Sequence, residues 1–109
     1  MNFEVDTTPH FQKSLKRLVK KYPSLKGEYA KLISKLEREP ETGTPIGKNC
    51  FKIRISIASK GKGKSGGGRV ITLVQFIYSK VILLEIFDKS EMESISEVDL
   101  QALILKVQN

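Results

Sequence analysis

The chain has little of the chemistry that holds many small proteins together: it has no tryptophan, one cysteine and one histidine. The lone Cys50 excludes an internal disulfide, and one Cys with one His excludes a structural zinc site. We therefore expect no metal and no cofactor, and we interpret Cys50 as a small buried hydrophobic residue. His10 is expected on the surface and is assigned no chemistry.

Long apolar segments are also missing. Val81–Leu84 is among the longest apolar runs, and it is far shorter than the roughly 20 residues that a membrane-spanning helix needs. The first residues lack the basic and apolar regions of a secretory signal. These features predict a cytoplasmic protein with no membrane association.

Acidic residues are absent from one long segment. Between Thr42 and Leu84 there is no Asp or Glu. The same segment carries eight cations, namely Lys48, Lys52, Arg54, Lys60, Lys62, Lys64, Arg69 and Lys80. The rest of the chain has eleven cations and twelve anions, so the formal net charge of +7 arises entirely here. A local positive excess is typical of a surface that binds a polyanion, most often nucleic acid.

The centre of this segment is the run Lys60-Gly-Lys-Gly-Lys-Ser-Gly-Gly-Gly-Arg69. One alternative is a solvated loop whose lysines only aid solubility, but a surface built for solubility mixes both signs of charge. Another is a degenerate nucleotide-binding loop. Such a loop must open a helix, and three consecutive glycines followed by strand-like residues disfavour one. Polyanion binding is therefore the favoured interpretation.

The hydrophobic pattern predicts one α+β domain over residues 1–109. Helical periodicity predicts two helices, Pro9–Tyr22 and Leu25–Leu36, which form a hairpin that ends before Pro40. Alternation predicts an opening strand at Phe3–Val5 and further strands at 51–58, 70–77 and 81–87, and a last helix follows Ser96. We expect an antiparallel sheet with the helices packed on one face and the other face open and basic.

Strict alternation also assigns faces in the last strand. It places Ile82, Leu84 and Ile86 on the apolar face, and Glu85 and Phe87 on the open face with Lys52 and Arg54. Glu85 is expected to pair with one of these two cations rather than act as a general base. Phe87 is either an ordinary exposed aromatic residue or a platform on which a nucleic-acid base stacks.

The assembled pattern resembles the RelE/ParE superfamily of bacterial toxins, and most closely its HigB-like branch. The resemblance covers essentially the whole chain. It is carried by the hairpin opening Thr-Pro-x-Phe-x-Lys-x-Leu-Lys-Arg-Leu, the stretch Phe51-Lys-Ile-Arg-Ile, the glycine–lysine loop followed by Arg69-Val-Ile, and the closing Phe87-Asp-Lys-Ser-Glu91. It implies a compact RelE-like fold and a toxin of a type II toxin–antitoxin pair. Such toxins cleave mRNA in the ribosomal A site, and a cognate antitoxin protein neutralises them.

The resemblance also implies roles for individual residues. The reaction is attack of a ribose 2′-hydroxyl on the adjacent phosphate, which positive groups promote by stabilising developing charge. Arg69 is then the phosphate clamp, with Lys62, Lys64 and Lys89 as proton-transfer or charge-stabilising groups. The residues expected to bind RNA are Lys52, Arg54, Lys60 and Phe87.

Phe87 departs from the family pattern. Many relatives carry Tyr at this position, and Phe87 keeps the ring but has no hydroxyl. A catalytically weakened toxin is therefore one alternative. Others are a gyrase poison of the ParE kind and a non-catalytic nucleic-acid-binding protein, since charge alone does not distinguish RNA from DNA.

Overall fold

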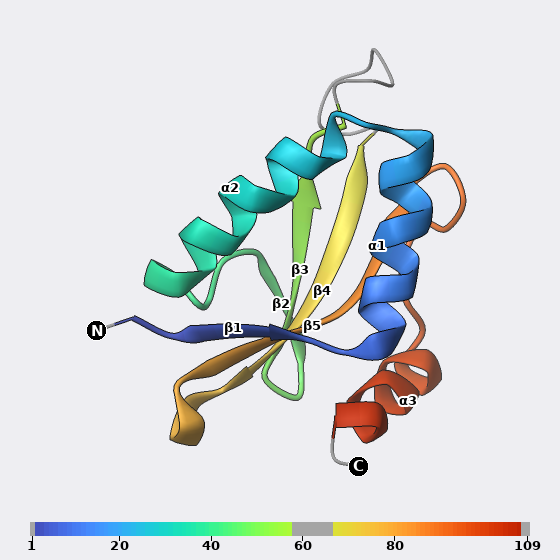
Figure 1. The fold of residues 1–109 in the computed structure, drawn as a ribbon. Helices are drawn as coiled ribbons and strands as arrows, with labels where there is room; N and C mark the ends of the chain where they lie inside the picture. The colour runs from blue at the N-terminus through green and yellow to red at the C-terminus, as the bar shows by residue number, and fades with distance from the viewer. Residues whose placement is uncertain (1, 58–66, 108–109) are drawn as a thin grey trace.

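The computed structural model describes residues 2–57 and 67–107. The elements in chain order are β1 (Glu4–Thr7), α1 (Pro9–Lys21), α2 (Leu25–Arg38), β2 (Thr44–Gly47), β3 (Cys50–Ile55), β4 (Gly68–Gln75), the 3₁₀ turn η3 (Phe76–Tyr78), β5 (Lys80–Asp88) and α3 (Glu97–Val107) (Figure 1). Lys60, Lys62 and Lys64 lie outside the described residues. In the described part of the chain, no helix has the length and apolar character needed to span a bilayer.

The five strands form one mixed sheet in the order β1-β5-β4-β3-β2. The pairs β2–β3, β3–β4 and β4–β5 are antiparallel, whereas β1 runs parallel to β5. The α+β class is confirmed, but the expectation of a wholly antiparallel sheet is wrong. Strand β2 was not predicted, because Thr-Pro-Ile-Gly has the composition of a turn. Pro45 is tolerated there because β2 is an edge strand, where a missing N–H breaks no interior ladder.

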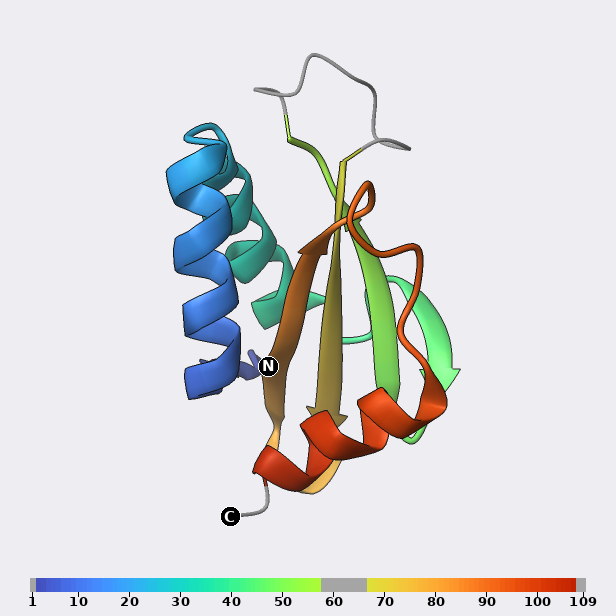
Figure 2. The ribbon, with the colours of Figure 1, turned by 90° about the vertical axis from the view of Figure 1, so that its right-hand side faces the viewer.

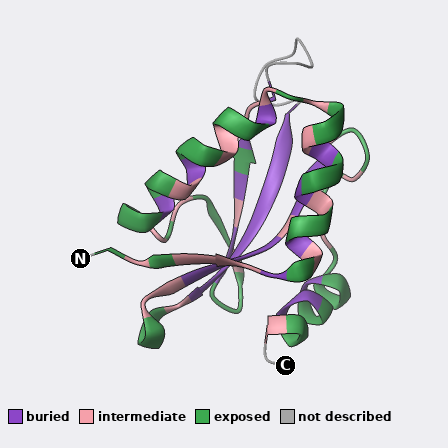
Figure 3. Cartoon of the chain, in the orientation of Figure 1, coloured by how far each residue is buried: buried purple, intermediate pink, exposed green. Residues whose placement is uncertain are grey.

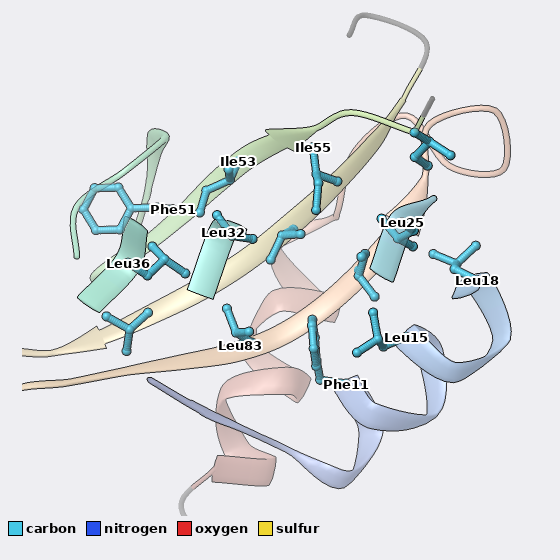
Figure 4. Close-up of a cluster of buried hydrophobic side chains, with 14 of the residues drawn as sticks. Phe11, Leu15, Leu18, Leu25, Leu32, Leu36, Phe51, Ile53, Ile55 and Leu83 are labelled. Atoms are coloured by element: carbon cyan, nitrogen blue, oxygen red, sulfur yellow. The ribbon is translucent and has the colours of Figure 1, made fainter. Parts of the chain in front are cut away.

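The predicted helical hairpin covers one face of the sheet. Thr8 caps α1, since its Oγ1 accepts a hydrogen bond from the Phe11 amide at 3.0 Å, and Pro9 occupies the first turn. The apolar faces of α1 and α2 then pack on β3, β4 and β5 (Figure 4). The buried side chains of this first core include Phe11, Leu15, Leu18, Leu25, Leu32, Leu36, Phe51, Ile53, Ile55 and Leu83.

Helix α3 packs on the opposite face of the sheet (Figure 2). Its apolar side chains join a second buried cluster, the α3 cluster, whose members are Cys50, Ile71, Leu73, Ile82, Leu84, Phe87, Leu100, Leu103 and Ile104. The prediction that all helices lie on one face is therefore wrong. The reason is visible in β4, which is buried along almost its whole length (Figure 3). A strand apolar on both sides needs cover on both sides.

A bulge in β5 changes which residues share a face. In the β4–β5 ladder Ile71 is opposite Glu85 but Thr72 is opposite Leu83, so Leu84 is an extra residue. Before the bulge, Ile82 and Leu84 lie in the α3 cluster. After it, Ile86 lies in the first core and Phe87 lies in the α3 cluster, so Ile82, Leu84 and Ile86 do not share one face. The strict alternation predicted for this strand is therefore wrong. Bulges occur frequently beside functional sites because they re-aim side chains, and this one places Phe87 opposite Arg69.

Candidate nucleic-acid interface

Four of the predicted site residues line one pocket. The pocket has a volume of about 400 Å³, and its lining residues are Thr44, Lys52, Arg54, Arg69, Lys89, Glu93 and Ser94. They come from β2, β3, β4 and the segment that joins β5 to α3. We call this hollow the cationic pocket. It gathers cations that are up to 37 residues apart in sequence, from Lys52 to Lys89.

Two arginines that line the pocket are neighbours on adjacent strands. Arg54 on β3 is directly opposite Arg69 on β4. Arg54 is exposed, whereas Arg69 is only 4% exposed. Burial, and secondarily the charge of Arg54, lowers the pKa of the Arg69 guanidinium from its ordinary value. Like charges directly opposite in a sheet are destabilising, so the fold retains a repulsion that a bound anion would relieve.

Arg69 keeps most of its hydrogen-bonding capacity. Its Nη1 donates to the Gly68 carbonyl oxygen at 2.9 Å. That bond is the one that its side chain makes to the described residues, although a guanidinium has five N–H donors. Gly68 itself is tightly enclosed, since a Cβ there would lie 3.1 Å from the Phe87 carbonyl oxygen and 3.1 Å from Ile55 Cγ2. The small residue lets β4 begin close between its two neighbouring strands.

The turn that carries Lys89 is held by hydrogen bonds to the buried Asp88. Asp88 is fully buried, and its carboxylate accepts from the Tyr22 hydroxyl at 2.8 Å and from the Ser90 amide at 3.0 Å. The Lys89 amide donates to the Gly67 carbonyl at 3.1 Å. Lys89 is half-buried, and these contacts fix its backbone beside the start of β4.

Two predictions about the last strand are corrected. Phe87 is only 4% exposed and packs in the α3 cluster, so it is not an exposed stacking platform. Glu85 pairs with His10 instead of Lys52 or Arg54, because its Oε2 lies 2.6 Å from His10 Nε2. Glu85 follows Val81 and Leu83 at alternate positions, and because these two residues lie in the first core its carboxylate is on the side of the sheet that α1 covers.

The carboxylate that does line the cationic pocket is Glu93, which the sequence analysis missed. The segment between β5 and α3 has no hydrophobic period, so its side chains could not be assigned to a face. The one available signal was proximity, since Glu93 follows Lys89 by four residues.

Cys50 has the predicted role of a buried hydrophobic residue. It is 1% exposed within the α3 cluster, and burial raises the pKa of its thiol to about 11. Among residues 2–57 and 67–107, no three His, Cys, Asp or Glu side chains gather where they could hold a metal ion.

The fold is similar to that of RelE toxins. A double arginine-to-alanine mutant of Escherichia coli RelE in the free state matches with a TM-score of 0.60 and 19% identity, over 85% of this chain and 90% of that one. Isolated E. coli RelE matches with a TM-score of 0.56 and 20% identity, over 94% and 97%. A chain of the Mycobacterium tuberculosis RelBE2 toxin–antitoxin complex matches with a TM-score of 0.62 and 18% identity, over 81% and 99%.

No family model matches the sequence, and no curated protein matches it either. At identities of 18–20%, the likeness to the solved structures establishes a RelE-like fold, which is the fold that the sequence resemblance implied. The activity has to be argued from the pocket.

Proposed function

We propose that this protein is an endoribonuclease toxin of a type II toxin–antitoxin pair that cuts mRNA in the ribosomal A site. The observation that carries the proposal is the cationic pocket, which brings together Lys52, Arg54, Arg69 and Lys89. Within residues 2–57 and 67–107, none of these four cations forms an ion pair with a carboxylate. The RelE-like fold supports the same conclusion. Assignment to the HigB-like branch rests on the sequence resemblance.

The pocket suits phosphodiester cleavage without a metal. The 2′-oxygen of a ribose attacks the adjacent phosphorus and loses its proton. The bond from phosphorus to the 5′-oxygen then breaks, and that oxygen takes up a proton. The products are a 2′,3′-cyclic phosphate and a 5′-hydroxyl. Such a reaction needs no water and places its extra negative charge on the phosphorane oxygens.

The described cations divide this work by position. Buried Arg69 stabilises the phosphorane, because preorganised charge acts most strongly where water is excluded. Arg54, which is exposed and directly opposite, adds a second positive charge. Lys89, on its fixed turn, protonates the leaving oxygen or stabilises charge. Lys52 binds the flanking RNA. The roles of Lys60, Lys62 and Lys64 remain those implied by the resemblance.

The partners follow from the same proposal. The M. tuberculosis neighbour is part of a toxin–antitoxin complex, and we propose a cognate antitoxin for this chain too. The mRNA is met on the ribosome, so the site of action is the cytoplasm.

A weakened toxin is a second candidate, and Phe87 favours it. Its ring is buried against α3 and has no hydroxyl, so it supplies neither a stacking face nor a proton. A gyrase poison or a simple nucleic-acid-binding protein would use the same positive surface without cleaving RNA.

The test is to induce the protein in a bacterial host and map mRNA 5′ ends by primer extension. We expect new in-frame cuts in translated messages that disappear in Arg69→Met. The matched control is Arg38→Met, an exposed arginine at the end of α2, which should still cut. Growth arrest without cuts would indicate gyrase poisoning or binding alone, and the absence of arrest would indicate an inactive relative.

A further inference from the structure

A second hollow adjoins the cationic pocket. It has a volume of about 210 Å³, and its lining residues are Ile46, Lys52, Ser94, Ile95, Ser96, Glu97 and Leu100. Lys52 and Ser94 line both hollows. The two hollows are therefore adjacent, with Arg54 and Arg69 lining only the cationic pocket and with Lys52 and Ser94 at their shared boundary.

One wall of the second hollow is apolar. Leu100 belongs to the α3 cluster, and Ile46 and Ile95 are half-buried against it. The rim is polar, with the exposed Ser94 and Glu97. Ser96 is already engaged, since its Oγ accepts from the Asp99 amide at 3.1 Å. A carboxylate acceptor thus lies at the edge of an apolar surface.

The size of the hollow limits its ligand. Sites for whole drug-sized ligands usually measure about 300–1,000 Å³, so 210 Å³ suits a single flat ring system. A ligand that fills both hollows has an anionic group on one side of Lys52 and a ring on the other. A nucleotide has this composition.

We propose that the second hollow is a base pocket, which receives the nucleobase of the RNA nucleotide whose phosphate lies in the cationic pocket. This inference rests on the proposed function. The apolar wall contacts the face of the base, and Glu97 accepts a hydrogen bond from an exocyclic amino group, as carboxylates do from cytosine N4. Because uracil has no amino group, the base pocket selects against it.

The experiment compares three probes by titration calorimetry: inorganic phosphate, cytidine 3′-monophosphate and uridine 3′-monophosphate. We expect the cytidine nucleotide to bind about tenfold more tightly than the uridine nucleotide, which is the effect of one charge-assisted hydrogen bond. Its advantage over inorganic phosphate should be at least as large, because phosphate also lacks the ring contact. Equal affinity of the cytidine nucleotide and phosphate would overturn the base pocket. If the wild-type protein does not bind inorganic phosphate at all, the proposed function and the base pocket are both overturned.

Two variants test the apolar wall and the Glu97 acceptor independently. Ile46→Trp fills the hollow and should reduce cytidine nucleotide binding to the level of phosphate. Glu97→Gln adds an amide that can donate to uracil, and it should abolish the preference for cytidine while preserving the fold. The control is Val98→Trp, since Val98 is 78% exposed and does not line the hollow. Unchanged cytidine preference in Glu97→Gln, or a control that loses it equally, would contradict the assignment.

Discussion

Arg54 and Arg69 should repel each other in the free protein and cooperate when an oxyanion is bound. They are directly opposite in the β3–β4 ladder. Favourable cross-strand pairs contribute about 0.2–1 kcal/mol, and like charges in that position are destabilising, so we take a repulsion of similar size. Burial of Arg69 reduces solvent screening, so we expect a value near 1 kcal/mol at low salt. Replacement of either residue by Met relieves this repulsion and keeps the apolar stem.

A double-mutant cycle isolates the repulsion from other losses. Arg69→Met also removes the hydrogen bond from Nη1 to the Gly68 carbonyl, at a cost of about 1 kcal/mol. That loss occurs with either residue at position 54, so it cancels in the interaction energy. The remaining term is the coupling between the two guanidinium groups.

Bound phosphate should reverse the sign of the coupling. At one hundred times its Kd, a ligand stabilises the folded state by about 2.7 kcal/mol. If both arginines are needed for binding, each single variant loses that stabilisation. The coupling then changes from about 1 kcal/mol unfavourable to roughly 1.7 kcal/mol favourable.

The assay is urea unfolding of the wild type, both single variants and the double variant, followed by circular dichroism. Ionic strength is matched with chloride when phosphate is omitted. As a control, the cycle between Arg54 and Arg38 should be additive within about 0.5 kcal/mol. If Arg54 and Arg69 prove additive without phosphate, or if phosphate leaves their coupling unchanged, our account of the pocket is refuted.

Three further predictions concern stability. Thr72 Oγ1 is buried and has no hydrogen-bond partner among the described residues. Thr72→Val should therefore stabilise the folded state by about 1 kcal/mol and raise Tm by about 4–8 °C. A lower Tm of the variant in calorimetry would contradict this. Tyr22→Phe removes a donor from buried Asp88 and should destabilise by about 1–3 kcal/mol in urea unfolding. Burial raises the pKa of Cys50 from 9.0 to about 11, so the unfolded thiol ionises first as pH rises. The wild type should then lose roughly 2–3 kcal/mol between pH 9 and 11 relative to Cys50→Ala, and parallel pH profiles of the two proteins would refute this.

The local elements could be predicted because their signals are local. The apolar spacing of α1 and α2 repeats over several turns, and Thr8 and Pro9 mark the start of α1. The alternation of β3 likewise fixed its two faces, which placed Lys52 and Arg54 together. Each of these features depends on residues close in sequence.

The features that were predicted wrongly depend on distant parts of the chain. The parallel pairing of β1 with β5 and the extra residue at Leu84 are set by the neighbouring strands. One signal was nevertheless present, since Val81–Leu84 is apolar at four consecutive positions. Such a run indicates a strand buried on both faces, and it predicts a cover such as α3 on the second face.

The candidate site was partly predictable for the same reason. Charge identified Lys52, Arg54 and Arg69, because a cluster of like charges has no role in a core. Lys89 lies outside the acid-free segment and was predicted only from the family resemblance. Thr44, Glu93 and Ser94 complete the cationic pocket but come from segments without hydrophobic period. Thr44 is positioned by the pairing of β2 with β3, where it is opposite Lys52. Glu93 and Ser94 lie in the segment that joins β5 to α3, and no local pattern encodes the path of that segment.

Phe87 lies where the α3 cluster meets the cationic pocket, and its replacement by Tyr tests whether position 87 belongs to the core or to the site. Towards one end of the face β4 contributes Ile71 and Leu73 to the α3 cluster, and at the other it contributes Arg69 to the cationic pocket. Phe87 belongs to the cluster but is directly opposite Arg69.

A Tyr hydroxyl at position 87 has two possible destinations with opposite consequences. Because the Phe87 ring is only 4% exposed, we expect the hydroxyl to be buried without a partner, so Phe87→Tyr should destabilise by about 1–3 kcal/mol and should not increase RNA cutting. Urea unfolding and 5′-end mapping of the same variant measure both effects. Unchanged stability with stronger cutting would mean that the hydroxyl reaches the cationic pocket. Position 87 would then be part of the site as well as of the α3 cluster.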